Sequence, residues 1–435
     1  MNSTFKKFIK YTSMNVMGML GLSCYILADT FFVSKGMGAD GLAALNLAIP
    51  VYSFVNGTGL MIGMGGGTLY SIALGKGERE NADRSFTTAL KLGAAAAVLF
   101  MLCGIFLSEQ ITSLLGGDKN NAPEVYEMTL TYLRIILLFS PGFILNNLLQ
   151  CFKRNDGSPQ LAMAAMLAGS FSNIILDYIF IFPLKMGILG AVLATAAAPL
   201  IGISVMMTRK SSFRPVKCPF APKKVLSLLS SGVPFLVTEV SAGVVMIIFN
   251  IIILRINGNM GVAAYGVVAN ISLVVMSVFT GIAQGMQPVL SSAFGSGRIK
   301  ETAEVLRYGI VTSLALAAVI YGMLFFLSSP ITGIFNSENI TELQTIAEKG
   351  LRLYFTACPF AALNIVIGVF FSSTMRESLA QIISLSRGFI IIIPAAFIMS
   401  ELFSLTGVWL ALPAAEIITA VISMIMLKLP GKDKI

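Results

Sequence analysis

Five ionisable residues interrupt long apolar stretches of this sequence, namely Asp29, Asp177, Glu239, Arg387 and Glu416. A charged residue at the centre of a membrane helix costs about 2.5–3.5 kcal/mol on insertion scales, so such residues face the protein interior or water. Acids in that position commonly bind cations or exchange protons, which makes these acids candidate functional residues. Arg387 and Glu416 lie on adjacent segments at neighbouring depths, and we expect them to form a structural ion pair.

Two of the acids have polar companions. Asn173 precedes Asp177 by one helical turn and shares its helix face, and Thr195 lies in the next apolar segment. Because successive segments cross in opposite directions, four polar residues come to the outer part of the first half of the chain: Asp29, Asn173, Asp177 and Thr195. Their oxygens predict a sodium site; alternatively, the two carboxyls share a proton, because neighbouring like charges resist double ionisation. The simplest alternative is that Asp29 caps a helix end and Asn173 bonds the backbone.

Glu239 is an acid of the second half without a predicted ion-pair partner, five residues after Pro234. A carboxylate at mid-membrane depth can hold a cationic substrate or take part in ion coupling. The alternative is a hydrogen bond from Ser241 or from a hydroxyl on another helix.

Long apolar runs must position these residues. Of 435 residues, 56% are hydrophobic and 12% charged, against about 25% charged in ordinary globular proteins. A spanning helix needs roughly 20 apolar residues. The sequence therefore predicts an all-α integral membrane protein with twelve transmembrane helices, at about 11–34, 42–74, 86–108, 125–152, 161–183, 187–208, 225–257, 262–294, 305–329, 345–372, 379–400 and 404–428.

Basic residues gather on one predicted side of the membrane. The net charge is +9, but its distribution follows the positive-inside rule rather than a nucleic-acid footprint. Both termini are therefore predicted to be cytoplasmic, and no nucleic-acid partner is expected. The loops on this side include Lys76, Arg79, Arg84, Lys153, Arg154, Arg298, Lys300, Arg307 and Arg376.

An internal repeat divides the chain. Gly75-Lys-Gly77 recurs as Gly295-Ser-Gly297, and further matches keep an offset of 217–220 residues over four helices. Parallel repeats of this kind are related by an axis along the membrane normal. We expect a first lobe at 1–208, a basic cytoplasmic linker at 209–224 and a second lobe at 225–435. The four polar positions of the first half correspond to apolar ones in the second: Phe249, Ile390, Pro394 and Leu412.

Residue types and motifs that the sequence lacks exclude several classes of protein function. The chain has no histidine, which rules out His-based hydrolysis and His-ligated metal chemistry. No nucleotide-binding G-x-x-x-x-G-K-[ST] motif occurs, and the five cysteines have no metal-site spacing. We therefore expect no enzymatic activity, no catalytic residues and no cofactor besides a coupling ion.

Several motifs together resemble the multidrug and toxic compound extrusion (MATE) family. They are residues 28–33 (ADTFFV), 41–44 (GLAA), 173–177 (NIILD) and 190–195 (GAVLAT), and the two glycine turns at 75–77 and 295–297. Residues 232–243 (GVPFLVTEVSAG) resemble its bacterial drug-export branch of MepA type. The likeness covers essentially the whole chain.

The resemblance implies export of organic cations in exchange for Na+ or H+, through a V-shaped, two-lobed bundle in the plasma membrane. It implies a first-lobe cation site at Asp29, Asn173, Asp177 and Thr195, with Asn147 and Gln150 extending the polar cavity and Glu239 assisting substrate binding or coupling. Two features depart from the family pattern. The first proline is Pro50, which removes the basis of a first-helix bending step, and residues 351–372 contain no acid.

The sequence thus predicts a monomeric, cation-coupled multidrug antiporter that confers drug resistance. A lipid-linked glycan flippase shares the architecture, but its pyrophosphate substrate needs a cationic cavity, whereas the charges here are mostly acidic. A membrane enzyme lacks any supporting motif, and a channel would show conductance without saturation.

Overall fold

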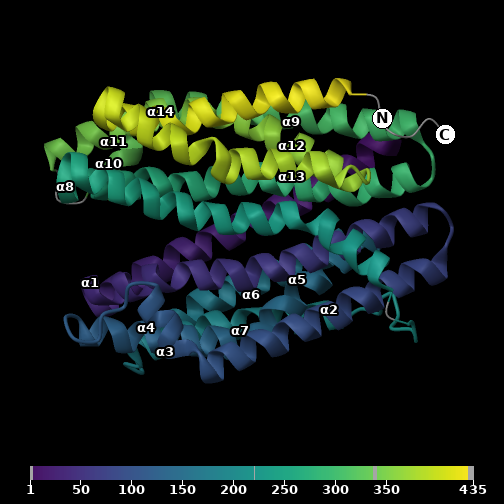
Figure 1. Cartoon of the computed structure of the whole chain (residues 1–435), viewed down its shortest axis with the longest axis horizontal. Coiled ribbons are helices and arrows are strands. Elements are labelled where there is room, and N and C mark those ends of the chain that lie inside the picture. Colours follow the sequence, from purple (N-terminus) through teal and green to yellow (C-terminus); the bar gives the residue numbers. More distant parts are fainter. Residues whose placement is uncertain (1–2, 220, 337–339, 430–435) are drawn as a thin grey trace.

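The computed structural model describes residues 3–219, 221–336 and 340–429, and in these ranges it contains helices and no strands. Two elongated bundles lie side by side (Figure 1). The first half of the chain forms α1 (Ser3–Gly75), α2 (Arg79–Phe106), α3 (Ser108–Leu114), α4 (Pro123–Leu138), α5 (Ser140–Asn155), α6 (Pro159–Ile181) and α7 (Gly187–Met207). The second half forms α8 (Pro222–Gly295), α9 (Ile299–Phe326), α10 (Ser328–Phe335), α11 (Thr341–Tyr354), η1 (Phe355–Ala357), α12 (Cys358–Ser373), α13 (Glu377–Leu385), η2 (Ser386–Ile390) and α14 (Ile392–Lys428).

Long apolar helices account for the predicted membrane crossings. Eight helical units are long and apolar enough to span a bilayer, or nine if α4 and α5, bent by 51°, count as one. Three of these units are broken once, at Gly38, Gly258 and Ser404, so each of them crosses twice. The described residues therefore make twelve crossings, which confirms the predicted all-α membrane fold.

The breaks repeat between the halves. Gly38 has φ 64° and ψ −147°, and Gly258 has φ 59° and ψ −155°. A positive φ suits glycine, which has no Cβ to clash with the backbone. The two breaks are 220 positions apart, the offset of the sequence repeat. Matching hydrogen bonds support the repeat as well, because Arg134 donates to Ser108 and Arg352 donates to Ser328.

The first and the last described residues lie at the same end of the molecule. The first turns of α1 and the last turns of α14 are at the same end in Figure 1, which we call the terminal end. The turn after α1 and the turn after α8 meet there, since the Ser296 hydroxyl donates to the Gly75 carbonyl at 2.9 Å. At the opposite end, α1 and α8 diverge in Figure 1.

Glycines join the two halves along α1 and α8. A Cβ atom at Gly65 would collide with the carbonyl of Leu228, and one at Gly232 with the carbonyl of Met61. Likewise, a Cβ at Gly285 would lie 2.7 Å from the Thr12 Cα. Small residues allow such backbone contact between membrane helices. We call this contact the terminal seam; its glycines are Gly65, Gly75, Gly232, Gly281, Gly285 and Gly295.

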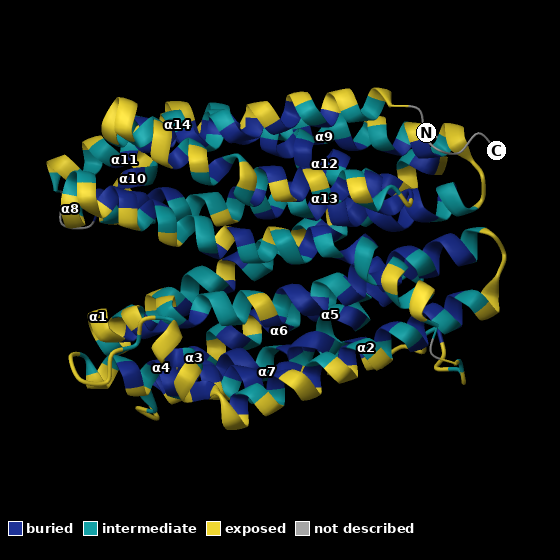
Figure 2. Cartoon of the chain, viewed as in Figure 1, coloured by how far each residue is buried: buried dark blue, intermediate teal, exposed yellow. Residues whose placement is uncertain are grey.

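Burial follows the bundle arrangement. Buried residues line the interiors of both bundles, and exposed ones lie mainly on their outer faces (Figure 2). Many of the exposed residues are large and apolar, among them Phe106, Leu114 and Phe326. Apolar outer faces suit contact with lipid, where water-soluble proteins would place charges.

The basic linker packs against the first bundle. Its Phe213 is buried among Tyr70, Phe86 and Phe152. Its backbone amides donate to side chains of the bundle: Ser212 N to Asp156 Oδ2, Arg214 N to Asp83 Oδ1 and Val216 N to Thr87 Oγ1. These contacts make the linker part of the first bundle's terminal surface. The lobe boundaries at 208 and 225 remain a prediction. Residues 1–2, 220, 337–339 and 430–435 of the predicted lobes and linker lie outside the described residues.

Candidate ion and substrate site

The four polar residues predicted in the first half come together between three helices. Asp29 lies on α1, Asn173 and Asp177 on α6, and Thr195 on α7. All four are buried, and Asn173 and Asp177 have 0% exposure. The i, i+4 spacing of Asn173 and Asp177 aligns them on one face of α6.

Direct contacts link the members of this cluster. The Asn173 amide donates to Asp177 Oδ2 at 3.0 Å and accepts from the Thr195 backbone N–H at 3.2 Å. The Asp29 and Asp177 carboxyls lie within hydrogen-bonding reach of each other. The Thr195 hydroxyl donates to its own helix at Ala191 O, and its oxygen is able to accept a hydrogen bond or to ligate. Asp29 lies inside α1 and not at its end, so the alternative in which it caps a helix end is wrong. Asn173 does bond the backbone, at Thr195 N, but it also bonds the Asp177 carboxyl.

Each carboxyl of the pair keeps one buried oxygen without a partner. These atoms are Asp29 Oδ1 and Asp177 Oδ1. Buried polar atoms are nearly always hydrogen-bonded, so an orphaned carboxylate oxygen is a candidate ligand position. Two carboxylates with an amide and a hydroxyl nearby are hard oxygen donors of the kind that alkali and alkaline-earth cations prefer. The described residues contain no cluster of three or more His, Cys, Asp or Glu side chains, so a transition-metal centre has no support there.

Three tyrosines, which the sequence reasoning missed, surround the cluster. Tyr25 lies one turn before Asp29 on α1, and its hydroxyl is 3.0 Å from that of Tyr52. Tyr132 on α4 is buried near Thr195. The i, i+4 spacing of Tyr25 and Asp29 was the available signal.

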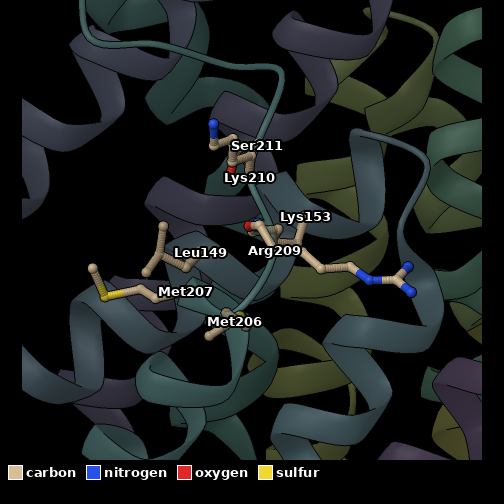
Figure 3. A pocket seen from close by; sticks show the side chains of 7 residues that line it. All are labelled: Leu149, Lys153, Met206, Met207, Arg209, Lys210 and Ser211. Carbon is tan, nitrogen blue, oxygen red and sulfur yellow. The ribbon is translucent and has the colours of Figure 1, made fainter.

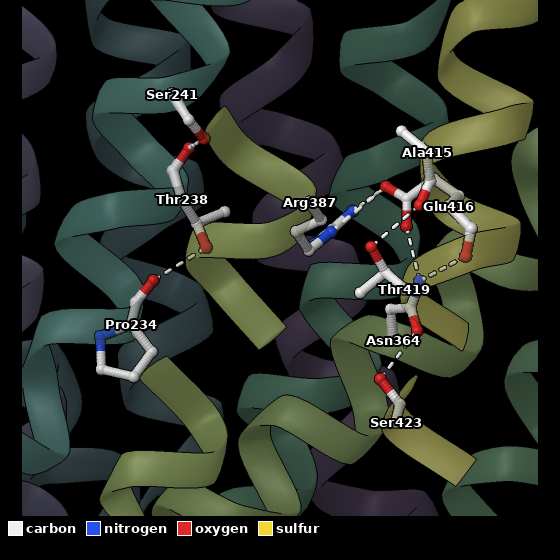
Figure 4. Close-up of polar contacts among 9 residues, drawn as sticks. All are labelled: Pro234, Thr238, Ser241, Asn364, Arg387, Ala415, Glu416, Thr419 and Ser423. Carbon is white, nitrogen blue, oxygen red and sulfur yellow. Dashed lines mark hydrogen bonds and ion pairs between the residues drawn. The ribbon is translucent and has the colours of Figure 1, made fainter. Parts of the chain in front are cut away.

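Glu239 is part of a series of hydrogen-bonded polar side chains that connects the two halves. Asn147 Nδ2 on α5 donates to Asn56 Oδ1 on α1 at 2.7 Å, and Asn56 Nδ2 lies 3.5 Å from Glu239 Oε2 on α8. Glu239 therefore has an amide from the other half as its neighbour, and the alternative in which Ser241 bonds it is wrong. The Ser241 hydroxyl donates to Thr238 O, and Thr238 in turn donates to Pro234 O (Figure 4).

Two residues of α5 were proposed to extend the polar cavity. Asn147 takes part in the hydrogen-bonded series with Asn56 and Glu239, whereas Gln150 does not. Gln150 lies near the middle of α5, is half-buried and forms no hydrogen bond with another described residue. Asn56 was missed because a lone amide in an apolar helix has no distinctive sequence spacing.

Arg387 and Glu416 form the expected ion pair inside the second bundle. Arg387 Nη2 lies 2.7 Å from Glu416 Oε1, and Asn364 donates to Glu416 Oε2 at 2.7 Å. Ser423 completes the network by donating to Asn364 Oδ1 (Figure 4). Both charged groups have partners, so this network fits a structural role.

The apolar counterpart of the four-residue polar cluster lies at different residues from those predicted. Ile390 is 62% exposed and Pro394 is exposed, whereas Ile392 and Ala396 are buried. The offset is 218 at the matching turn residues Gly157 and Met375, and the wider π-helical turn η2 adds one residue beyond it. The equivalents of Asn173 and Asp177 are therefore Ile392 and Ala396, which pack in one core with Phe249. The polar cluster is still absent from the second half.

Two residues counted as loop charges lie inside the protein. Lys153 and Arg154 occupy the last turn of α5, and both are buried. Lys153 Nζ donates to Arg209 O at 2.6 Å, beside a pocket of about 230 Å³ where the linker leaves α7 (Figure 3). The pocket is lined by Leu149, Lys153, Met206, Met207, Arg209, Lys210 and Ser211 and includes none of the acids. It results from linker docking and is separate from the candidate site.

Comparison with known proteins gives the family. The MatE family model matches residues 16–179 and 234–398, most of the chain and both halves of the repeat. The chain belongs to the MatE family. The MATE resemblance drawn from the motifs is thereby confirmed, and the chain is a multi-pass membrane transporter rather than an enzyme.

Similar curated proteins cover nearly the whole chain. The multidrug export protein MepA of Staphylococcus saprophyticus is 26% identical over 98% of this chain and 94% of that protein. The MepA of Staphylococcus aureus is 27% identical over the same shares. Among solved structures, an outward-facing multidrug resistance MATE transporter has a TM-score of 0.89 at 21% identity, covering 98% of this chain and 95% of that one. A MATE crystal structure in complex with MaL6 has a TM-score of 0.91 at 20% identity, covering 98% and 96%. These structures support the two-lobed fold.

Proposed function

We propose that this MATE transporter exports organic cations in exchange for Na+ or H+ by alternating access between its two lobes. The observation that carries the proposal is the buried Asp29–Asp177 pair, in which each carboxyl keeps an oxygen without a partner. Two acids so close in a low-dielectric site repel each other unless a cation or a proton lies between them. A coupling ion supplies that positive charge.

Each of the four residues of the cluster has its own role in binding the coupling ion. Asp29 and Asp177 provide the negative charge, and their orphaned oxygens are the ligands. Asn173 positions Asp177 through its amide, and Thr195 offers a hydroxyl oxygen. One elementary charge crossing 100 mV supplies about 2.3 kcal/mol, enough to drive a modest substrate gradient. No further cofactor is needed.

Glu239 and its amide partners form the substrate part of the proposal. The carboxylate lies between the halves, beside Asn56 and within a chain that reaches Asn147. A cationic group entering from either lobe would meet this negative charge. The names of the curated relatives, multidrug export proteins, agree with a broad range of organic substrates.

The terminal end is assigned to the cytoplasm of a plasma membrane. The basic loops and the linker lie at this end, as the positive-inside rule requires. Because the terminal seam is closed, the described conformation is then outward-facing. The chain is proposed to act as a monomer, since both lobes are supplied by one polypeptide.

The test is transport by Asp177→Asn in proteoliposomes. Uptake of a fluorescent organic cation is measured with sodium and pH gradients imposed separately, which also identifies the coupling ion. We expect gradient-driven uptake to fall to the level of protein-free vesicles, because the amide cannot supply the second negative charge. Asp40→Asn, an exposed acid on the same helix α1, is the matched control and should transport normally. Full uptake by Asp177→Asn would refute the site assignment.

A further inference from the structure

Arg154 is a buried cation without an acidic partner in the terminal seam. Its side chain is 3% exposed. Its guanidinium contacts neutral groups: Asn15 Oδ1 at 2.5 Å, Gln284 Oε1 at 3.5 Å, Met64 Sδ at 3.1 Å and Cys151 Sγ at 3.7 Å. Its Nε has no hydrogen-bond partner. Among the described residues, no ion pair includes Arg154.

The contacts of Arg154 come from both halves of the molecule. Asn15 lies on α1 and also donates to Gly281 O on α8 at 3.0 Å, while Gln284 lies on α8. The next residue of α5, Asn155, exchanges hydrogen bonds with Gln287 of α8 across the same boundary at 3.1 and 3.2 Å. Arg154 is therefore enclosed because the two halves meet around it.

Enclosure of the charged Arg154 has a free-energy cost that enclosure of its neutral neighbours does not have. A guanidinium stays protonated at any physiological pH, so Arg154 cannot lose its charge on burial. Taking a charge out of water is costly unless an opposite charge compensates it, and neutral acceptors compensate only in part. The neighbouring Asn155–Gln287 pair, by contrast, is neutral and stabilises closure without that cost. Separation of the halves at the terminal end would return Arg154 to water.

We propose that Arg154 destabilises the closed terminal seam and thereby keeps the open and closed states close in free energy. The inference rests on the proposed alternating-access function and deepens it, because it names a residue that sets the conformational balance. Glycine packing and the neutral amide pair stabilise the closed seam, and the unpaired guanidinium opposes them. Transport by alternating access needs neither state to dominate.

The experiment measures the seam directly. Spin labels are placed at Glu80→Cys and Lys300→Cys, two exposed positions at the starts of α2 and α9, after replacement of the native cysteines. Double electron–electron resonance in lipid nanodiscs then reports the populations of short and long distances. Arg154→Met should raise the closed-to-open ratio by about tenfold, because it removes the buried charge. A shift toward the open state would show that Arg154 holds the seam together, and would overturn the proposal.

A second variant tests the same charge without removing the arginine. Gln284→Glu keeps the side-chain shape and gives Arg154 an anion, so the closed-to-open ratio should again rise. Combining it with Arg154→Met leaves a lone buried carboxylate, and this rise in the closed-to-open ratio should disappear. Arg134→Met, a partly exposed arginine of the first half, should leave the distances unchanged. An unchanged distribution in Gln284→Glu would also overturn the proposal.

The readout requires no transported compound. If the distances shift as expected while no cation gradient drives export, the conformational inference stands and the proposed function fails. If export is coupled but Arg154→Met leaves the distances unchanged, the inference fails and the function stands.

Discussion

At the residue scale, the two acidic sites that lack a basic partner differ in their surroundings. Asp29 and Asp177 form a carboxyl pair inside the first half, whereas Glu239 is a single acid facing an amide from the other half. Tyr52 lies close enough to both Asp29 and Glu239 to interact electrostatically with each carboxylate. A pair suits a small ion or proton, and a single acid between lobes suits a larger cation.

Glu239→Gln separates these two roles. The amide keeps the shape and the contact with Asn56 but removes the charge, so affinity for an organic cation should fall by about tenfold, or ~1.4 kcal/mol. Ion binding at Asp29 and Asp177 should persist. The measurement is equilibrium binding of a fluorescent organic cation to purified protein, with neutral analogues for comparison.

Ser241→Ala is the matched control for that substitution. Its hydroxyl bonds only the carbonyl of Thr238 on its own helix, so cation affinity should be unchanged. Equal affinity of Glu239→Gln and the parent protein would mean that Glu239 does not hold the cation.

The convergence of four polar residues in the first half was predictable because burial of acids in a membrane is rare and expensive. Asn56 and Tyr52 were not, since neutral polar residues are common in apolar helices and only packing shows which ones meet. Arg154 was misplaced for a related reason. A cation near a helix end is usually a loop charge, and the sequence does not reveal that the other half covers it.

At the element scale, helix breaks were predicted better than helix irregularities. The gaps between the predicted spans at 34–42 and 257–262 contain the breaks Gly38 and Gly258. The π-helical turn η2 was not predicted, because no residue type marks it, and the constant repeat offset failed there. Docking of the linker was also unforeseen, since it depends on the aromatic contacts of Phe213 with three residues distant in sequence.

The ion pair that joins η2 to α14 should stabilise the second bundle as a unit. Glu416→Gln leaves the largely buried Arg387, 14% exposed, without its counter-charge, and the expected cost is about 3 kcal/mol. Thermal unfolding in detergent should report a lower Tm. The double variant Arg387→Met with Glu416→Gln should recover much of the loss, because it removes the stranded charge. A Tm for Glu416→Gln equal to that of the parent would show that the pair contributes no stability.

At the scale of the whole molecule, the terminal seam is built from backbone contact. A methyl group at Gly285 would lie 2.7 Å from the Thr12 Cα. Gly285→Ala should therefore force the halves apart at this end, at a cost of about 2 kcal/mol, which is roughly a thirtyfold change in the closed-to-open ratio. The same Glu80 and Lys300 spin labels measure it.

Gly322→Ala provides the control, because a Cβ there meets nothing within 4 Å. It should leave the label distances unaltered. If Gly285→Ala gave the parental distribution as well, the seam would be able to absorb a methyl group, and tight packing would not determine closure.

The contact between Gly65 and Leu228 has a bioenergetic consequence. Where one backbone rests on another, no side chain can rotate aside to open a narrow water-filled passage, so the halves either touch or separate as units. In the proposed ion-coupled transporter, a closed seam of this kind resists the leak of small ions that would dissipate the gradient while no substrate is bound. Flexible side chains at the same positions would be expected to let small ions leak through the closed seam and slowly dissipate the gradient.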